Sequence, residues 1–196
     1  MIAFIEGLIE EKNPAYLVVN CGGIGYLIHI SLYTYSAIPD KGTIRVHTIQ
    51  VIREDAHTLY GFSSTEEKEL FRHLITVSGV GPNTARMILS SMSPAEIRSA
   101  IIAKNISMLQ SIKGIGAKTA QRIVVDLKDR LEKEGVPGDD YLMPANNTIQ
   151  EEALSALVML GFNKNSAQKA IGAILRKKQG EVVTAEELVK EALKSV

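Results

Sequence analysis

The sequence has no tryptophan and a single cysteine, Cys21, among its 196 residues. One cysteine excludes a disulfide within the chain, and no cysteine–histidine cluster has the spacing of a zinc site. No apolar run approaches the roughly 18 residues that a membrane span requires. The first residues also lack the basic segment and cleavage site of a signal peptide. We therefore expect a cytoplasmic protein that needs no membrane, metal or cofactor.

The formal net charge is zero, which by itself does not suggest a nucleic-acid-binding protein. The charges are unevenly distributed, however. Residues 63–134 carry 11 basic and 8 acidic residues, whereas residues 1–62 carry 4 and 6, and residues 135–196 carry 7 and 8. The excess of positive charge lies in the central segment, and a patch that binds a nucleic-acid backbone would require it there.

The most informative pattern is a nine-residue motif that occurs twice, 35 residues apart. It reads VSGVGPNTA at residues 77–85 and IKGIGAKTA at residues 112–120. In each copy an apolar segment with helical periodicity leads into a Gly–apolar–Gly turn, and a second helical segment follows. The pattern predicts two helix–hairpin–helix elements in tandem.

The residue types of this motif favour phosphate binding. Glycines permit positive φ and a close approach of backbone to another molecule, and the apolar residue between them is expected to anchor the turn. The helix that follows begins with amides that lack intrahelical partners, and its partial positive charge attracts anions. The predicted contacts with DNA backbone are Gly79, Val80, Gly81, Asn83, Thr84 and Arg86 in the first copy, and Gly114, Ile115, Gly116, Lys118, Thr119 and Arg122 in the second.

Three other interpretations of these glycines are possible. A Walker A loop requires glycine directly before lysine, but Ala117 separates Gly116 from Lys118. A dinucleotide-binding fingerprint requires a third glycine, where this chain has Thr84 and Thr119. Two ordinary glycine-capped helix turns would explain either copy alone almost as well. The repetition, with matching threonine and alanine positions, favours phosphate binding.

Residues 1–62 predict a small barrel. Five short apolar and β-branched segments are separated by turn residues, with one helical insert near residues 33–37. The OB-fold is the commonest such barrel among nucleic-acid-binding proteins, and a barrel of another kind is the alternative. Gly7 suggests a bulge or a bend in the first strand. The histidines of this segment are best explained as strand-face residues.

The remaining chain predicts helices and one linker, so the expected fold is a multidomain α+β protein. Residues 63–134 form the helix–hairpin–helix domain, residues 135–147 a flexible linker, and residues 148–196 a three-helix domain resembling ubiquitin-associated domains. Capping boxes at Thr148 with Glu151 and at Thr184 with Glu187 mark two helix starts. The tail residues that serve either as its core or as a docking patch are Leu157, Leu160, Phe162 and Leu193.

In this order the segments resemble the RuvA family over the full length. The most telling parts are the paired hairpins and the barrel's ending in Arg53–Glu54–Asp55–Ala56 and Leu59–Tyr60–Gly61–Phe62. Members are bacterial subunits that bind Holliday junctions, the four-way DNA junctions of recombination and repair, within a branch-migration complex. The resemblance implies a homotetramer, or an octamer of two such rings.

The resemblance also implies particular roles. Glu54 and Asp55 would form an acidic pin near the strand crossover, with Arg53 beside the DNA backbone. The three-helix tail would dock a RuvB-like hexameric ATPase, and a junction resolvase would join the larger complex. Members of the family often carry lysine where this chain has Asn83, so the first hairpin is expected to depend more on backbone amides and Arg86.

The resulting hypothesis is a non-catalytic, structure-selective Holliday junction-binding subunit whose partner hydrolyses ATP. One alternative is a metal-dependent, structure-selective nuclease that holds its metal with Glu54 and Asp55. The other is a generic helix–hairpin–helix DNA-binding adaptor. Cleavage of a junction would favour the first alternative, and equal binding of junction and linear duplex would favour the second.

Overall fold

The computed structural model describes residues 1–133, 145–177 and 183–195. The chain divides into two compact units, Met1–Pro137 and Gly138–Val196. The first unit contains the barrel and the two helix–hairpin–helix elements, and the second contains the tail helices. Each unit is described by itself.

Five strands form a closed barrel in the order β1-β2-β3-β5-β4, which confirms the predicted OB-type barrel. Strands β3 and β5 pair in parallel, and the other neighbours pair antiparallel. Alternate residues, such as Leu17 and Val19 of β2, point into the barrel and are fully buried, as the period of a strand requires. The strands are β1 (Phe4–Asn13), β2 (Tyr16–Cys21), β3 (Ile24–Ile30), β4 (Thr43–Ile52) and β5 (His57–Phe62), and helix α1 (Leu32–Ala37) connects β3 to β4.

The sequence leaves Gly7 open between a bulge and a bend, and the structure has no bulge at Gly7 itself. The register of the β1–β2 pair shifts between Ile9 and Glu11, three residues further along the strand. Gly7 lies instead where two strands approach closely, since a Cβ there would come within 2.2 Å of the Asn20 carbonyl oxygen. A glycine inside a strand indicates either a bulge or a close approach, and the sequence alone does not distinguish them.

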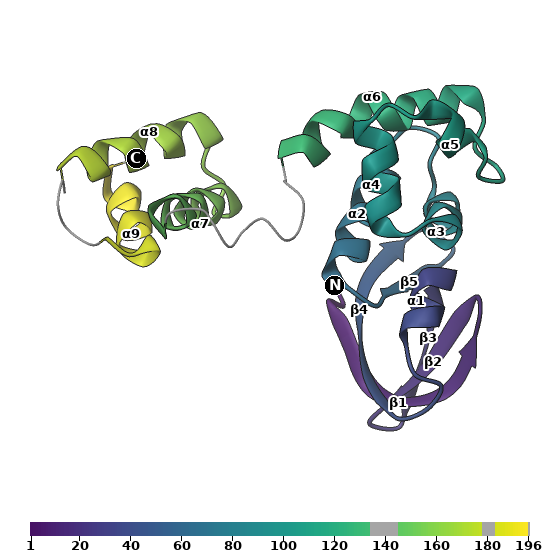
Figure 1. Cartoon of the computed structure of the whole chain (residues 1–196). Coiled ribbons are helices and arrows are strands. Elements are labelled where there is room, and N and C mark those ends of the chain that lie inside the picture. The colour runs from purple at the N-terminus through teal and green to yellow at the C-terminus, as the bar shows by residue number, and fades with distance from the viewer. Residues whose placement is uncertain (134–144, 178–182, 196) are drawn as a thin grey trace. The chain divides into compact units, whose positions relative to one another are not determined.

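Five helices pack on one end of this barrel (Figure 1). Their core is continuous with β5, because Tyr60 and Phe62 belong to the same buried cluster as Phe71 and Leu74. Ser64, Ser93 and Asn105 cap three of the helices through side-chain oxygens, as helix N-termini favour. The helices are α2 (Thr65–Thr76), α3 (Pro82–Ser91), α4 (Pro94–Ile102), α5 (Ile106–Gln110) and α6 (Ala117–Lys133).

A buried carboxylate, that of Glu67 in α2, joins the helices to the barrel. Its oxygens accept hydrogen bonds from the hydroxyls of Ser31 and Thr34, next to or within α1. They also accept bonds from the backbone amide and the hydroxyl of Ser63, at 3.1 and 3.2 Å. A carboxylate only accepts hydrogen bonds, so the ring of donors matches it. This network fixes the orientation of α2 on the barrel.

The second unit contains helices α7 (Ala145–Met159), α8 (Lys164–Lys177) and α9 (Ala185–Ser195). Their shared core is small and includes Ala153, Ile171 and Leu188. The capping box at Thr184 is confirmed, since Glu187 N–H donates to the Thr184 hydroxyl and Thr184 N–H donates to the Glu187 carboxylate, both at 3.3 Å.

The predicted helix start at Thr148 is wrong, because α7 begins at Ala145. The last three residues of the expected linker therefore belong to a helix, and the rest of that linker lies outside the described residues. A single capping signal does not determine where a helix begins. Residues ahead of the signal can also be helical, because solvent can supply hydrogen-bond partners for the first amides of a helix. Across the described ranges, no helix combines the length and apolarity needed to cross a bilayer.

Candidate nucleic-acid interface

The two copies of the motif fold into the same turn. Gly79 has φ of 89° and Gly114 has φ of 90°, a conformation that favours glycine. The next residue in each copy is buried. Val80 N–H donates to the Val77 carbonyl and Ile115 N–H donates to the Ile112 carbonyl, each at 3.0 Å. The apolar residue thus anchors each turn, as predicted, and the sequence repeat is a repeat in space.

The second glycine of each turn is not required by its backbone conformation. Neither Gly81 nor Gly116 lies in the left-handed region, and a Cβ on either would meet no atom of the described chain within 4 Å. Folding therefore does not require glycine at these two positions. Gly81 is the N-cap of α3, and Gly116 accepts the first backbone hydrogen bond of α6 from Ala120. Glycine there leaves the backbone open to a molecule outside the chain, at the helix end that attracts anions.

The side chains of the second turn face solvent. Lys118 and Arg122 are exposed, and Thr119 is half-buried. Arg122 Nη1 lies 3.4 Å from the hydroxyl oxygen of Ser78, the residue before Gly79. The helix of the second turn therefore touches the loop of the first, so the two turns form one continuous surface.

The side chains of the first turn are bound to the barrel instead. Tyr60 donates its hydroxyl to Asn83 Oδ1 at 3.2 Å. Arg86 Nη1 donates to the Ala15 carbonyl at 2.8 Å, in the β1–β2 turn. Both Asn83 and Arg86 were predicted to contact DNA, and the sequence did not indicate that each also has a partner in the barrel.

The surroundings of Arg86 affect two neighbouring side chains. Burial lowers the pKa of His29 below its usual value, and the positive charge of Arg86 lowers it further. Burial raises the pKa of Tyr60, although Arg86 and Arg53 oppose that effect. Near neutral pH both groups are therefore uncharged, and the positive charge beside them comes from Arg86 and Arg53.

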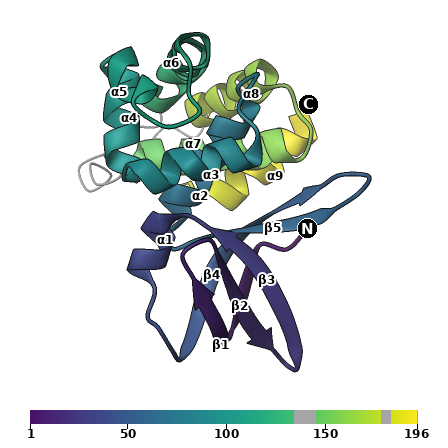
Figure 2. The same cartoon turned by 90° about the vertical axis from the view of Figure 1, so that its right-hand side faces the viewer.

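The acidic residues Glu54 and Asp55 form the two-residue tip of the β4–β5 hairpin. Arg53 N–H donates to the Ala56 carbonyl at 2.8 Å, and Ala56 N–H donates back to the Arg53 carbonyl at 3.4 Å. All four residues are exposed, and the hairpin extends well past the barrel wall (Figure 2). The tip is thus a narrow, solvated projection that carries two carboxylates.

This acidic hairpin and the first turn line the same cleft, which has a volume of about 200 Å³. The hairpin contributes Arg53, Asp55 and Thr58, and the turn contributes Gly81 and Asn83 among others. A strand whose phosphate is bound at the first turn would therefore pass close to the carboxylate of Asp55, which lines the cleft. Within the described ranges, no group of three or more histidine, cysteine, aspartate or glutamate side chains could hold a metal ion.

The four tail residues proposed from the sequence divide between core and surface. Leu157 is only 1% exposed, and Phe162 packs against the same core. Leu160, at 59% exposed, and Leu193 lie on the surface. Leu157 is therefore a core residue, which was the likelier role for any one of the four taken singly.

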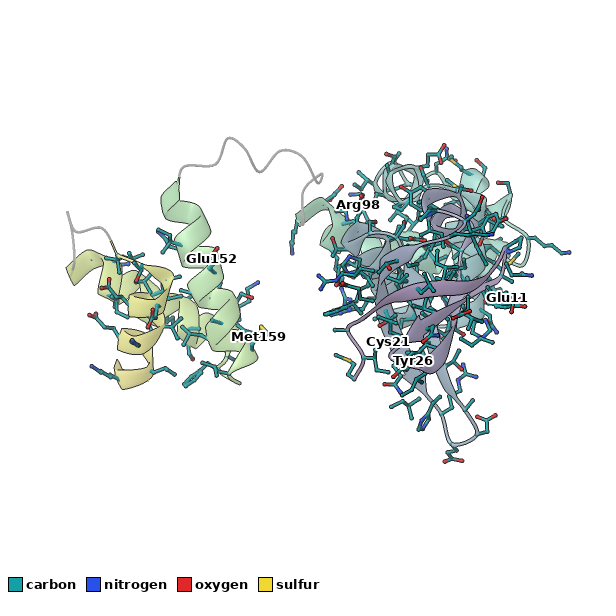
Figure 3. The ribbon with its side chains drawn as sticks, turned by 90° about the horizontal axis from the view of Figure 1, so that it is seen from below. Glu11, Cys21, Tyr26, Arg98, Glu152 and Met159 are labelled. Carbon is teal, nitrogen blue, oxygen red and sulfur yellow. The ribbon has the colours of Figure 1, made fainter. Side chains whose placement is uncertain are left out.

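Sequence reasoning missed Met159, which is 86% exposed and projects from the end of α7 (Figure 3). Helix α7 ends in a Schellman motif. Gly161 has φ of 94°, its N–H donates to the Val158 carbonyl, and Phe162 N–H donates to the Leu157 carbonyl. The turn leaves Met159 and Leu160 outside the core, and the Met–Leu–Gly–Phe sequence could have indicated this.

Comparison with known families covers all three parts of the chain. Residues 1–61 match the RuvA N terminal domain, residues 71–129 match the SAM-like helix-hairpin-helix tandem, and residues 148–196 match the RuvA C-terminal domain. The first two matches include both the acidic hairpin and the two glycine turns.

Relatives named "Holliday junction branch migration complex subunit RuvA" match this chain over its whole length. The protein of Christiangramia forsetii is 50% identical over 197 residues, covering 100% of both chains. That of Bacteroides fragilis is 48% identical over 201 residues, covering 99% of each chain. That of Flavobacterium psychrophilum is 44% identical over 196 residues, covering 100% of both. With the barrel, the paired turns and the three-helix tail all in the expected order, this chain belongs to the RuvA family.

Proposed function

We propose that this protein is a structure-selective DNA-binding subunit that holds Holliday junctions for branch migration, as the names of its relatives state for them. The observation that carries the proposal is the cleft shared by a phosphate-binding turn and an acidic hairpin. The turn attracts a DNA backbone and the hairpin repels one. A site with both properties suits DNA whose strands separate, rather than an uninterrupted duplex.

The two turns supply affinity without reading sequence. Each presents a glycine backbone and a helix N-terminus, which recognise phosphate, and the exposed Lys118 adds a positive charge to the second turn. Backbone contacts position a protein on DNA but carry no sequence information. Specificity must then come from the shape of the DNA.

The acidic hairpin supplies that discrimination. Glu54 and Asp55 are exposed at the end of a projecting hairpin, where they would meet the phosphates of a continuous duplex and repel them. At a crossover the strands diverge, so the carboxylates can occupy the space between them. Such repulsion of the wrong ligand is a general source of specificity.

Each chain presents two such turns among its described residues, so tight binding requires several chains. A homotetramer around the crossover would present eight turns to four arms and bring four acidic hairpins to the centre. Symmetric assembly converts weak contacts into strong binding through effective concentration. It also matches the fourfold connectivity of the junction.

The tail is proposed to dock a RuvB-like hexameric ATPase, which would supply the chemical step while this chain remains non-catalytic. Met159 and Leu160 are exposed apolar residues at the end of α7. Adjacent exposed apolar side chains commonly indicate an interaction site. The exposed Leu193 of α9 is a further candidate contact, whereas the buried Leu157 acts by supporting α7.

The experiment that tests this function is a gel-shift comparison of a four-way junction with linear duplex of equal length, in magnesium and over a range of salt. We expect preference for the junction and no cleavage.

The variant Glu54→Gln/Asp55→Asn should bind linear duplex more tightly and lose most of the preference. Glu10→Gln/Glu11→Gln, which removes two adjacent carboxylates from β1, is the control of equal charge. Equal binding of both DNAs by the unaltered protein would overturn the proposal, and cleavage would favour a nuclease.

A further inference from the structure

The two motif copies differ on one face of the helix that follows each turn. The first helix carries Asn83, Arg86 and Ser90 at spacings of three and four residues, which place them on the same face. Counting 35 residues on, the second helix has Lys118, Gln121 and Val125 at these positions. Matching positions next to both turns keep threonine and alanine. The copies also differ elsewhere, as at Ser78 and Lys113 or Met87 and Arg122, but this face differs at all three of its positions.

In the first copy this face is hydrogen-bonded to the barrel domain along its whole length. Asn83 accepts from the Tyr60 hydroxyl at 3.2 Å, and Arg86 donates to the Ala15 carbonyl at 2.8 Å. Ser90 accepts from the backbone amide of Leu32 at 3.1 Å. These three contacts reach β5, the β1–β2 turn and α1, three separate parts of the barrel domain.

In the second copy the same face is exposed. Lys118 and Gln121 face solvent, and Val125 is 70% exposed. The second turn thus presents a free cationic side chain where the first presents a side chain held by the barrel. The two turns, alike in backbone, are attached differently to the acidic hairpin.

We propose that Asn83, Arg86 and Ser90 are positioning residues that fix the first turn relative to the acidic hairpin and so set the preference for junctions. This inference rests on the proposed function and deepens it. In this arrangement the first turn sets the distance between a bound phosphate and the carboxylates of Glu54 and Asp55. The second turn supplies affinity for any DNA backbone.

The physical reason is that repulsion by the carboxylates distinguishes junction from duplex only if the bound duplex cannot move away from them. The interaction between charges weakens with distance and is screened by salt over about 10 Å. If α3 could tilt away from the barrel, a duplex bound at the first turn would shift and escape the carboxylates. The three hydrogen bonds oppose that tilt together with the buried packing of Ile88 and Leu89, and the cleft lined by both elements shows that they lie close together.

The test compares junction and linear-duplex affinities of the full-length protein carrying Arg86→Gln/Ser90→Ala. Gln is the residue of the second copy, and both changes remove contacts with the barrel without touching the glycine turn. We expect the ratio of duplex to junction dissociation constants to fall by about fivefold or more. The matched control, Gln121→Ala/Val125→Ala, alters the same face of the second helix and should leave the ratio within about twofold.

Further variants separate positioning from direct phosphate binding and from loss of fold. If Arg86 acts by binding phosphate, both affinities fall together and the slope of log affinity against log salt decreases by about one. That result, or an unchanged ratio, overturns the proposal. Tyr60→Phe removes a single hydroxyl and should lower the ratio in the same direction, and Arg86→Lys, which keeps a donor for Ala15, should largely restore it.

Thermal unfolding of every variant identifies any that do not fold. In that case the ratio of duplex to junction dissociation constants of Tyr60→Phe tests the proposal. The failure of the proposed function looks different from the failure of this inference. In the first case the unaltered protein itself shows no preference for the junction. In the second the unaltered protein prefers the junction, and the barrel-contact variants keep that preference.

Discussion

Arg122 Nη1 of α6 lies 3.4 Å from the Ser78 hydroxyl oxygen in the loop of the first turn. The two glycine turns are thus joined by a side-chain contact across 44 residues of sequence. Each turn is also anchored by a buried apolar residue, so the contact and the two anchors favour one arrangement of the turns. Preorganised contacts bind more tightly than contacts that must be ordered on association.

Replacing Lys118 by alanine should weaken junction and linear-duplex binding alike. The side chain is exposed at the start of α6, and we expect about a three- to tenfold loss and a salt slope smaller by about one, as for one lost phosphate contact. Fluorescence anisotropy with labelled DNAs over a salt series measures both. Lys133→Ala, at the far end of the same helix, is the control. A selective loss for the junction would contradict the view that the second turn is indifferent to DNA shape.

The glycines of the turns should separate folding from binding. Gly81→Ala and Gly116→Ala add a Cβ where the described chain leaves space and where φ is ordinary, so we expect stability to change by less than about 1 kcal/mol. DNA binding should nevertheless fall by about tenfold, because the methyl group blocks the approach of a phosphate.

Gly79→Ala is the contrasting variant for that experiment. Its φ of 89° is strained for alanine, so it should lose stability by about 1 kcal/mol or more. Urea denaturation and anisotropy, measured on the same preparations, test both expectations. Normal DNA binding by Gly81→Ala and Gly116→Ala would contradict the role assigned to these turns.

The barrel, the helices of the central segment and the shape of the turns could be predicted from the sequence, because each depends on local patterns. Alternating apolar residues and the Asn–Pro and Gly–Gly turns define the strands, and the repeat defines the hairpins. The contacts of Asn83 and Arg86 with the barrel could not be predicted. Each joins residues more than 20 positions apart, and both side chains suit phosphate contact equally well.

The same distinction explains why the sequence left Gly7 open between a bulge and a bend, and why it misplaced the helix start at Thr148. A glycine in a strand and a threonine before a glutamate are each compatible with two local structures. Packing decides between them: the β1–β2 approach at Asn20 requires the glycine, and α7 begins one turn ahead of the capping signal. The exposure of Met159 likewise depends on packing, because it is set by where α7 ends relative to the small core of the second unit.

Glu67→Gln should destabilise the first unit strongly. The buried carboxylate accepts hydrogen bonds from the hydroxyls of Ser31 and Thr34 and from both donors of Ser63. An amide would direct its own N–H groups at one set of these donors, leaving buried polar groups unpaired. We expect a loss of about 2–4 kcal/mol in the free energy of unfolding, measured by urea denaturation.

Glu66→Gln changes the neighbouring carboxylate, which also lies in the first turn of α2. Its effect should stay below about 1 kcal/mol, since only an interaction with the helix dipole is lost. Similar losses for the two variants would show that the charge of the first turn, and not the hydrogen-bond network of Glu67, stabilises the joint between helices and barrel.

Met159→Ser/Leu160→Ser should abolish docking of the ATPase partner while leaving junction binding intact. Both side chains are exposed at the end of α7, so the tail should remain folded. The turns proposed to bind DNA lie in the other unit. Removing two apolar anchors from an interface commonly costs about 2–4 kcal/mol, or at least thirtyfold in affinity. Titration of a purified RuvB-like ATPase against each variant, with a parallel gel shift on junction DNA, measures the two effects separately.

Ala173→Ser, an exposed position on α8, is the control for an added hydroxyl. If the double variant binds the ATPase as the unaltered protein does, the docking surface lies elsewhere on the tail, and Leu193→Ser on α9 then tests the remaining exposed leucine.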